Sequence, residues 1–191
     1  MQQLFEKHTK ELIALLDSLD STFYEQVARA ADHLHEAFGK GYSAYTAGNG
    51  GSASQAQHFA EELVGRYRKN RKPYPMMALT ADGTALTCIG NDFGFSEVFS
   101  RQVEGLGKAG DVFVALSTSG NSENILKAVE AARANGMTVI ALTGTTGKLR
   151  ELADIAIEVP IDKNERMQEV HLHAIHVICE SFEDEIRTPS L

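Results

Sequence analysis

The chain has 191 residues, of which 43% are hydrophobic, and it carries a formal net charge of −8. This length and apolar content suit one compact domain with a sizeable core. The acidic balance argues against nucleic acid as a partner, because a phosphate backbone favours a basic surface. No apolar run reaches transmembrane length and the N-terminus lacks a secretory pattern, so we expect a cytoplasmic protein with no membrane partner. Cys88 and Cys179 lie far apart in apolar contexts, and we expect both to be buried, reduced thiols.

Two helices are predicted at the N-terminus. Apolar residues recur at helical spacing over residues 3–19. A second helix is expected from about Ser21 to Phe38, because Gly39 and Gly41 follow it as a stop signal. We interpret residues 1–40 as a helical arm of the same domain, and its apolar stripes suit it to the core of an oligomer.

The rest of the chain, residues 41–191, alternates between short apolar runs and helical patterns. The predicted strands are Tyr42–Thr46, Met76–Leu79, Val112–Leu116, Thr138–Leu142 and Ile155–Val159. The last helix is expected from about Asn164 to Ile186. This order predicts an α/β fold with a parallel sheet of about five strands and helices on both sides. Ligands of such sheets bind beyond the carboxyl ends of the strands.

The first such end carries the loop Gly48-Asn49-Gly50-Gly51-Ser52, which leads into a predicted helix. Free backbone N–H groups at a helix N-terminus favour an anion, and glycines let a ligand approach the backbone. The loop lacks the third glycine of the dinucleotide fingerprint and the lysine of a P-loop, which argues against NAD or ATP. A plain tight turn remains the alternative.

A second loop of this kind follows the third predicted strand. It offers four hydroxyl groups in six positions, from Ser117, Thr118, Ser119 and Ser122. Serine-rich turns are also common helix caps, so this loop alone leaves both interpretations open. The two loops together predict a phosphorylated ligand.

His58 and Glu62 are four residues apart on the first of these helices and therefore share one face. The spacing suits a shared metal ion or an acid–base pair, and a surface hydrogen bond is the alternative. The C-terminal helix adds a polar cluster that is either a metal face or an amphipathic surface: Gln168, Glu169, His171, His173 and His176. We assign to solvent or packing Glu61, Glu169 and His173.

Two further segments carry polar side chains. The stretch Gly90-Asn91-Asp92-Phe93-Gly94 is interpreted as a turn that follows an apolar segment and precedes a helix. Asp92 within it is a candidate to hydrogen-bond sugar hydroxyls. The basic run over residues 66–72 is interpreted as a solvated loop or a subunit contact.

Five segments together resemble the sugar isomerase (SIS) domain family, and more narrowly the bacterial phosphoheptose isomerases. They are Gly48-Asn49-Gly50-Gly51-Ser52, His58-Phe59-Ala60-Glu61-Glu62-Leu63, Gly90-Asn91-Asp92-Phe93-Gly94-Phe95, Leu116-Ser117-Thr118-Ser119-Gly120-Asn121-Ser122, and Arg166-Met167-Gln168-Glu169 through His176. The resemblance extends from the first predicted strand to the last helix. The serine loop alone is moderately specific, whereas its combination with His-x-x-x-Glu and Gln…His is highly specific.

The resemblance implies a single SIS domain that binds one zinc ion per subunit through His58, Glu62, Gln168 and His176. It implies that the sugar phosphate is held by Asn49, Gly50, Gly51, Ser52, Glu62, Asn91, Asp92, Ser117, Thr118, Ser119, Ser122 and Gln168. It also implies a homotetramer with active sites between subunits, to which a neighbour contributes a C-terminal helix. Glu165 departs from the family pattern, in which an aspartate is expected, and is left out of the site.

The activity implied by the resemblance is isomerisation of sedoheptulose 7-phosphate to D-glycero-D-manno-heptose 7-phosphate, the first step of nucleotide-activated heptose synthesis for bacterial lipopolysaccharide. A proton moves between C1 and C2 through an enediol, with Glu62 as the candidate base and His176 as the candidate for the second proton transfer. The alternatives are a non-catalytic SIS protein that binds the replication initiator and another SIS sugar-phosphate isomerase. The presence of both Glu62 and His176 argues against the non-catalytic class.

Overall fold

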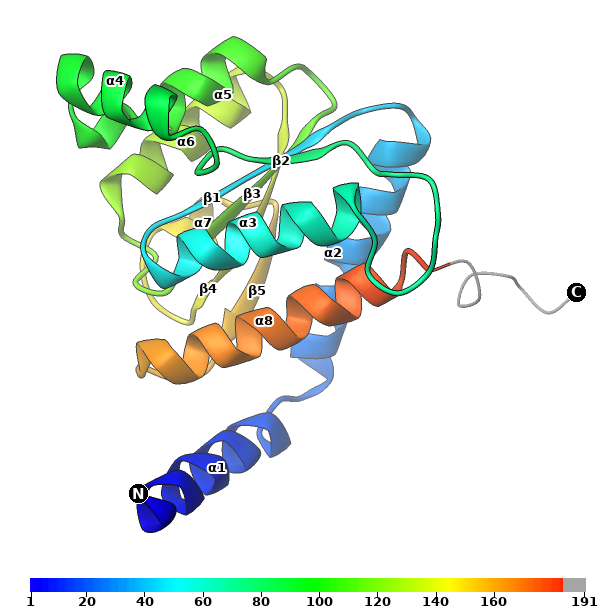
Figure 1. The fold of residues 1–191 in the computed structure, drawn as a ribbon, viewed down its shortest axis with the longest axis vertical. Coiled ribbons are helices and arrows are strands. Elements are labelled where there is room, and N and C mark those ends of the chain that lie inside the picture. The colour runs from blue at the N-terminus through cyan, green and yellow to red at the C-terminus, as the bar shows by residue number, and fades with distance from the viewer. Residues whose placement is uncertain (184–191) are drawn as a thin grey trace, which may run out of the picture.

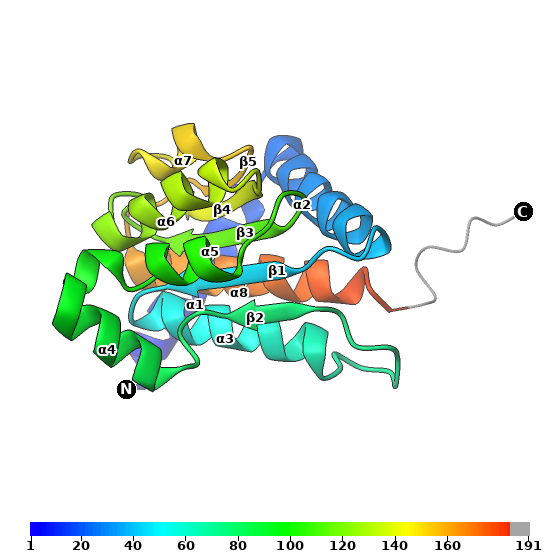
Figure 2. The same ribbon diagram turned by 90° about the horizontal axis from the view of Figure 1, so that it is seen from above.

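A five-stranded parallel sheet forms the centre of the molecule, and the structure, a computed structural model, describes residues 1–183 (Figure 1). The strands are β1 (Ala44–Gly48), β2 (Met76–Ala78), β3 (Val112–Ser117), β4 (Thr138–Gly144) and β5 (Ile155–Val159). They lie side by side in the order β2-β1-β3-β4-β5, and every neighbouring pair is parallel (Figure 2). The predicted α/β fold with a parallel sheet is confirmed.

Helices cover both faces of the sheet. One face packs against α2 (Ser21–Gly39), α3 (Gly51–Val64) and α8 (Asn164–Glu180). The other packs against α5 (Ser100–Leu106), α6 (Glu123–Ala134) and α7 (Leu149–Leu152). Beyond the sheet lie α4 (Gly83–Phe93) and the short 3-10 helix η1 (Phe95–Glu97) (Figure 1).

Strand alternation divides the core between these two helical layers. Along β3, Val114 and Leu116 face the layer of α2, α3 and α8, whereas Phe113 and Ala115 face the layer of α5 and α6. All four side chains are fully buried, as expected for a central strand covered on both faces. The central strands are therefore rigid supports for the loops at their carboxyl ends.

The first helix, α1 (Gln2–Asp17), extends away from the body of the chain (Figure 1). Lys163 at the start of α8 pairs with Glu11 at 2.9 Å and holds α1 near that helix. Leu4, Phe5 and Ile13 remain exposed along α1. No helix within the described part of the chain combines the length and apolarity needed to cross a membrane.

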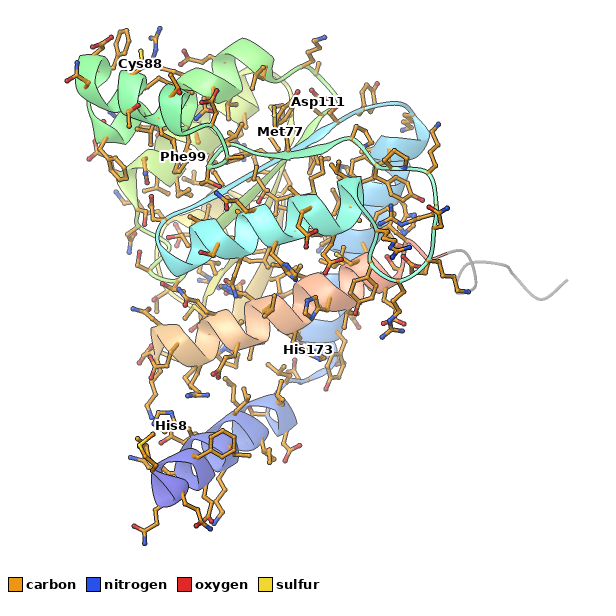
Figure 3. All side chains as sticks on the ribbon, in the orientation of Figure 1. His8, Met77, Cys88, Phe99, Asp111 and His173 are labelled. Carbon is orange, nitrogen blue, oxygen red and sulfur yellow. The ribbon has the colours of Figure 1, made fainter. Side chains whose placement is uncertain are left out.

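Two expectations about the C-terminal helix and the cysteines are corrected. The helix α8 ends at Glu180, because the next backbone N–H groups, those of Phe182 and Glu183, bond to carbonyl groups three rather than four residues back, at Cys179 and Glu180. Residues 184–186 of the predicted helix lie outside the described residues. Cys179 is buried as predicted, but Cys88 is exposed on α4 (Figure 3).

The segment predicted as a turn at residues 90–94 is the end of a helix. Asp82 caps α4 by accepting hydrogen bonds from the backbone N–H groups of Thr84 and Ala85. The helix then continues to Phe93 and stops at Gly94, whose φ of 93° is a conformation that favours glycine. Asn91 and Asp92 therefore lie in the last turn of α4, where both are exposed.

Candidate active site

The two predicted loops both lie beyond carboxyl ends of strands, after β1 and β3. In the first loop, a Cβ atom added at Gly48 would lie 2.6 Å from the backbone carbonyl carbon of Ser52, so only glycine permits this close turn. Gly50 has a φ of 55°, which directs the chain into α3. The sequence of this loop is thus explained by the sharp turn from strand to helix.

A reciprocal amide pair joins the two loops. The side chain of Asn49 donates to Asn124 at 2.8 Å, and the side chain of Asn124 donates back to Asn49 at 2.9 Å. Asn124 is buried in the first turn of α6, and the sequence analysis did not identify it as a functional residue. The sequence signal that could have identified Asn124 is a polar side chain on the inward face of a helix start. This pair fixes the spacing between the two loops that were predicted to bind a phosphate.

The hydroxyl-rich loop after β3 has an inner and an outer part. Ser117 is buried, and its Oγ lies 3.2 Å from the Oγ of Ser122. Ser119 is exposed and accepts a hydrogen bond from the backbone N–H of Asn121 at 3.2 Å. Thr118 is half-buried between them. The structure therefore places the four predicted hydroxyl residues in one continuous turn that leads into α6.

Neither helix at these loops is capped by a side chain of the described residues. The N-cap residue of α3 is Gly50, which has no side chain, and the side chain of Ser122, the N-cap residue of α6, makes no capping hydrogen bond. By contrast, Asp20 and Asp82 cap α2 and α4. An uncapped helix start is not unusual in itself, since α5 and α8 also lack a side-chain cap. Here the uncapped starts of α3 and α6 are joined by the Asn49–Asn124 amide pair and lined with hydroxyl groups. Together they form a suitable binding site for a phosphate.

A second group of polar side chains lies further along α3 and α8. The Nε2 atom of His58 lies 3.4 Å from Oε1 of Glu62 and 3.0 Å from Nε2 of His176. One ligand atom from each of these three half-buried residues falls within 4.8 Å of the other two. The predicted pairing of His58 with Glu62 on one face of α3 is confirmed, and helix packing adds His176.

This His–Glu–His group is a chemically suitable metal site. Two imidazole nitrogens and one carboxylate are the donor set of a catalytic zinc site with an open position. The two facing Nε2 atoms cannot both carry hydrogen at 3.0 Å, so either one of them accepts a hydrogen bond from the other or both face a cation. Burial lowers the pKa of His176, and the neighbouring His58 lowers it further, so the neutral, ligating form is favoured.

Two neighbours of the group were not predicted to take part. Oε1 of Glu61 lies 3.2 Å from Nδ1 of His58, although the carboxylate is exposed. The ring of Tyr67 lies 5.8 Å from the ring of His176. A carboxylate on the far nitrogen of an imidazole fixes its orientation, so Glu61 orients His58 rather than facing only solvent. His173, by contrast, is exposed on the side of α8 away from α3, as predicted (Figure 3).

Gln168 lies beside the glycine loop after β1. Its side-chain amide occupies the space beside Gly51, where a Cβ atom would come within 2.6 Å of Oε1. Its backbone carbonyl accepts a hydrogen bond from the side chain of Gln55 at 2.6 Å. Gln168 precedes His176 by about two turns of α8. In the single chain this residue is thus grouped with the glycine loop.

Asn91 and Asp92 are the predicted site residues that the structure does not bring to either loop through a described contact. Asn91 donates to Asp92 at 2.7 Å, and Asp92 lies 3.7 Å from the thiol of Cys88 on the same helix. Because α4 extends beyond the sheet and both side chains are exposed, Asn91 and Asp92 are accessible to a neighbouring molecule (Figure 1). Whether they bind substrate stays a prediction.

The fold and the site together define an α/β protein that is built to bind a phosphorylated ligand and to carry out acid–base or metal-assisted chemistry on it. The family model of the SIS domain matches residues 7–144. The phosphoheptose isomerase of Serratia proteamaculans is 49% identical over 169 residues, which are 87% of each chain. That of Escherichia fergusonii is 47% identical over 87% of this chain and 88% of its own.

Solved structures agree with these relatives. The phosphoheptose isomerase of Neisseria gonorrhoeae is 41% identical, with a TM-score of 0.89 over 94% of this chain and 97% of its own. The enzyme from Francisella tularensis is 37% identical, with a TM-score of 0.84 over 94% of each chain. The chain belongs to the SIS domain family and, within it, to the phosphoheptose isomerases. These similarities do not favour the non-catalytic alternative.

Proposed function

We propose that this chain interconverts sedoheptulose 7-phosphate and D-glycero-D-manno-heptose 7-phosphate, the first step of nucleotide-activated heptose synthesis. The observation that carries the proposal is the contact of His58 and Glu62 on α3 with His176 on α8. It places a carboxylate and one imidazole on the helix that begins at the proposed phosphate-binding loop, with a second imidazole beside them on α8. Relatives that carry the name phosphoheptose isomerase support the choice of a seven-carbon substrate.

The proposed reaction transfers one proton from C1 of the ketose to C2 through an enediol. Glu62 takes the proton from C1 and returns it to C2, so the carboxylate is regenerated at the end of the cycle. His176 moves the hydroxyl proton from the oxygen at C1 to the oxygen at C2. Its lowered pKa favours the neutral imidazole that such a transfer requires at neutral pH.

The phosphate end of the substrate would be bound by the two loops. We assign this role to the backbone at Gly50 and Gly51, to Ser52, and to the hydroxyl groups of residues 117–122. Binding the charged end about three helical turns from Glu62 orients the reacting carbons without placing a second anion beside the carboxylate.

We assign the metal site to His58, Glu62 and His176, with Gln168 as the fourth predicted ligand, and we propose zinc as the ion. The donor set of the first three residues fits a catalytic zinc site. When bound, zinc would supply Lewis-acid polarisation of the substrate carbonyl. Gln168 of α8 lies beside the glycine loop and accepts a hydrogen bond from Gln55 of α3, so it would link the metal ligands to the proposed phosphate end of the site.

We further propose a homotetramer whose active sites lie between subunits. Two features support it: the exposed apolar side chains of α1, and an apolar groove of about 610 Å³ lined by Leu16, Tyr24 and Val177 between the N-terminal helices and α8. The helix α4, which has no buried residue, would then face a neighbouring subunit with Asn91 and Asp92. A cytoplasmic location stays a prediction.

The proposal is tested by following purified protein with sedoheptulose 7-phosphate in D₂O. We expect the aldose product to carry solvent deuterium at C2, because a carboxylate base exchanges its proton with water. Glu62→Gln should lower kcat by about 10²- to 10⁴-fold. The control Glu130→Gln, on α6 across the sheet, should leave kcat unchanged. A wild-type protein that binds a replication initiator and turns over no sedoheptulose 7-phosphate would contradict the proposal.

A further inference from the structure

The segment between α3 and β2 contains a buried arginine. This segment leaves the end of α3, passes the end of α8 and returns to the sheet (Figure 1). Within the basic run of residues 66–72, the side chain of Arg71 is only 3% exposed, whereas that of Arg68 is 61% exposed. A fully charged guanidinium is costly to bury, so its partners must account for its position.

Arg71 binds the end of α3 through main-chain carbonyl groups. It donates from Nη2 to the carbonyl oxygen of Glu62 at 2.7 Å and from Nη1 to that of Leu63 at 2.9 Å. The last carbonyl groups of a helix lack partners within the helix and carry partial negative charge. The guanidinium therefore caps the turn of α3 that carries the candidate base.

The same guanidinium binds the chain just after α8. Its Nε donates to Oε1 of Glu183 at 3.4 Å, and the side chain of Glu183 is only 6% exposed. The other carboxylate oxygen of Glu183 accepts from the backbone N–H of Lys69 at 2.7 Å. Arg71 and Glu183 therefore join the end of α3 to the end of α8, and both helices carry members of the His–Glu–His group.

We infer that Arg71 is a positioning residue, which holds Glu62 in the register with His176 that the site requires. The inference rests on the proposed function of this site. The rigid, planar fork of an arginine can bind two successive carbonyls and a carboxylate at once, which a lysine cannot do. The Nε2 atoms of His58 and His176 lie 3.0 Å apart. If α3 slid or rotated against α8, this distance would change and the three ligand atoms would separate.

A purely structural role is the rival explanation. A buried ion pair that only stabilises the fold would affect the melting temperature and leave the assembled site unchanged. The two explanations differ in what they predict for metal affinity. Groups that orient metal ligands typically change affinity or activity by about 10- to 100-fold when they are replaced.

The experiment compares the full-length wild-type protein with Arg71→Lys, Arg71→Met and Glu183→Gln. Zinc affinity is measured by competition with a chromophoric chelator, and kcat and KM are measured for sedoheptulose 7-phosphate. For Arg71→Lys we expect zinc affinity and kcat to fall by about tenfold each. KM should stay within about twofold, because the phosphate-binding loops lie at the other end of α3.

The matched control is Arg68→Met. Arg68 forms an ion pair between the same segment and Glu180 of α8, but this pair is exposed and does not reach the carbonyl groups of α3. We expect this variant to keep wild-type zinc affinity and kcat. If Arg71→Met does not fold, Arg71→Lys and Glu183→Gln provide the same test with smaller changes in shape.

A lowered melting temperature of Arg71→Lys with unchanged zinc affinity and unchanged kcat would overturn the inference. A wild-type protein that binds zinc but does not isomerise the sugar would contradict the proposed function and leave the inference about Arg71 standing. In that case the fall in zinc affinity of Arg71→Lys relative to Arg68→Met still supports the positioning role.

Discussion

Asn49 and Asn124 exchange two hydrogen bonds, of 2.8 and 2.9 Å, across 75 positions of the sequence. Each amide is both donor and acceptor, so the pair fixes the turn before α3 relative to the first turn of α6. The two predicted phosphate-binding loops, after β1 and β3, are thereby held together. Asn49 was predicted to bind substrate, which stays a prediction, and in the structure its side chain joins the two loops.

The amide pair should therefore affect substrate binding more than chemistry. Asn124→Ala leaves the amide of Asn49 without its partner, and we expect a loss of about 1–3 kcal/mol in the free energy of unfolding. KM for the sugar phosphate should rise because the loops separate. A double-mutant cycle with Asn49→Ala measures the coupling, and additive effects of the two substitutions on stability would contradict this prediction.

The position of His176 predicts a sharp difference between two histidines on α8. His176→Gln should lower kcat by about 10²-fold or more, because it removes both a proton carrier and a metal ligand. His173→Gln should have a much smaller effect on kcat, since His173 is exposed and lies outside the His–Glu–His group (Figure 3). Steady-state kinetics of the two variants provide the measurement, and equal losses would argue against the assigned site.

Removal of metal should abolish most of the activity. The His–Glu–His donor set predicts that dialysis against a chelator lowers kcat and that added zinc restores it. The variant His58→Ala should lose this recovery at the same zinc concentration. Undiminished turnover by protein shown to be metal-free by elemental analysis would remove zinc from the mechanism.

His171 should make stability depend on pH. Burial lowers the pKa of His171 from 6.5 to about 4, against a weaker effect of its contact with the Thr143 carbonyl. Between these values the unfolded chain binds a proton that the folded protein does not. The free energy of unfolding should therefore fall by about 1.4 kcal/mol per pH unit as pH drops below 6.5, and be independent of this group above it.

Urea denaturation of metal-free protein at several pH values tests this prediction. In His171→Gln the amide can still donate to the Thr143 carbonyl, but it does not titrate. The difference in unfolding free energy between wild type and this variant should decrease as pH falls from 7 to 5. A difference that is constant over this range would show that His171 does not titrate as its burial implies.

Several elements could be predicted because their signals are local. The strand Ile155–Val159 has the predicted bounds, since Asp154 and Pro160 mark its ends. The turn predicted at Asn91 and Asp92 was wrong, for a local reason as well. Asn, Asp and Gly favour turns, but here the glycine ends a helix that begins eleven residues earlier, at Gly83.

The sequence by itself determined that two hydroxyl- and glycine-rich loops follow buried strands and that His58 and Glu62 share a helix face. Both conclusions depend only on the periods of strand and helix, which the chain fixes locally. The tertiary structure alone decided that His176 meets His58 across 118 positions and that Arg71 binds the carbonyl of Glu62. Those contacts depend on how the buried faces of α3 and α8 pack, and no local pattern of residues specifies that geometry.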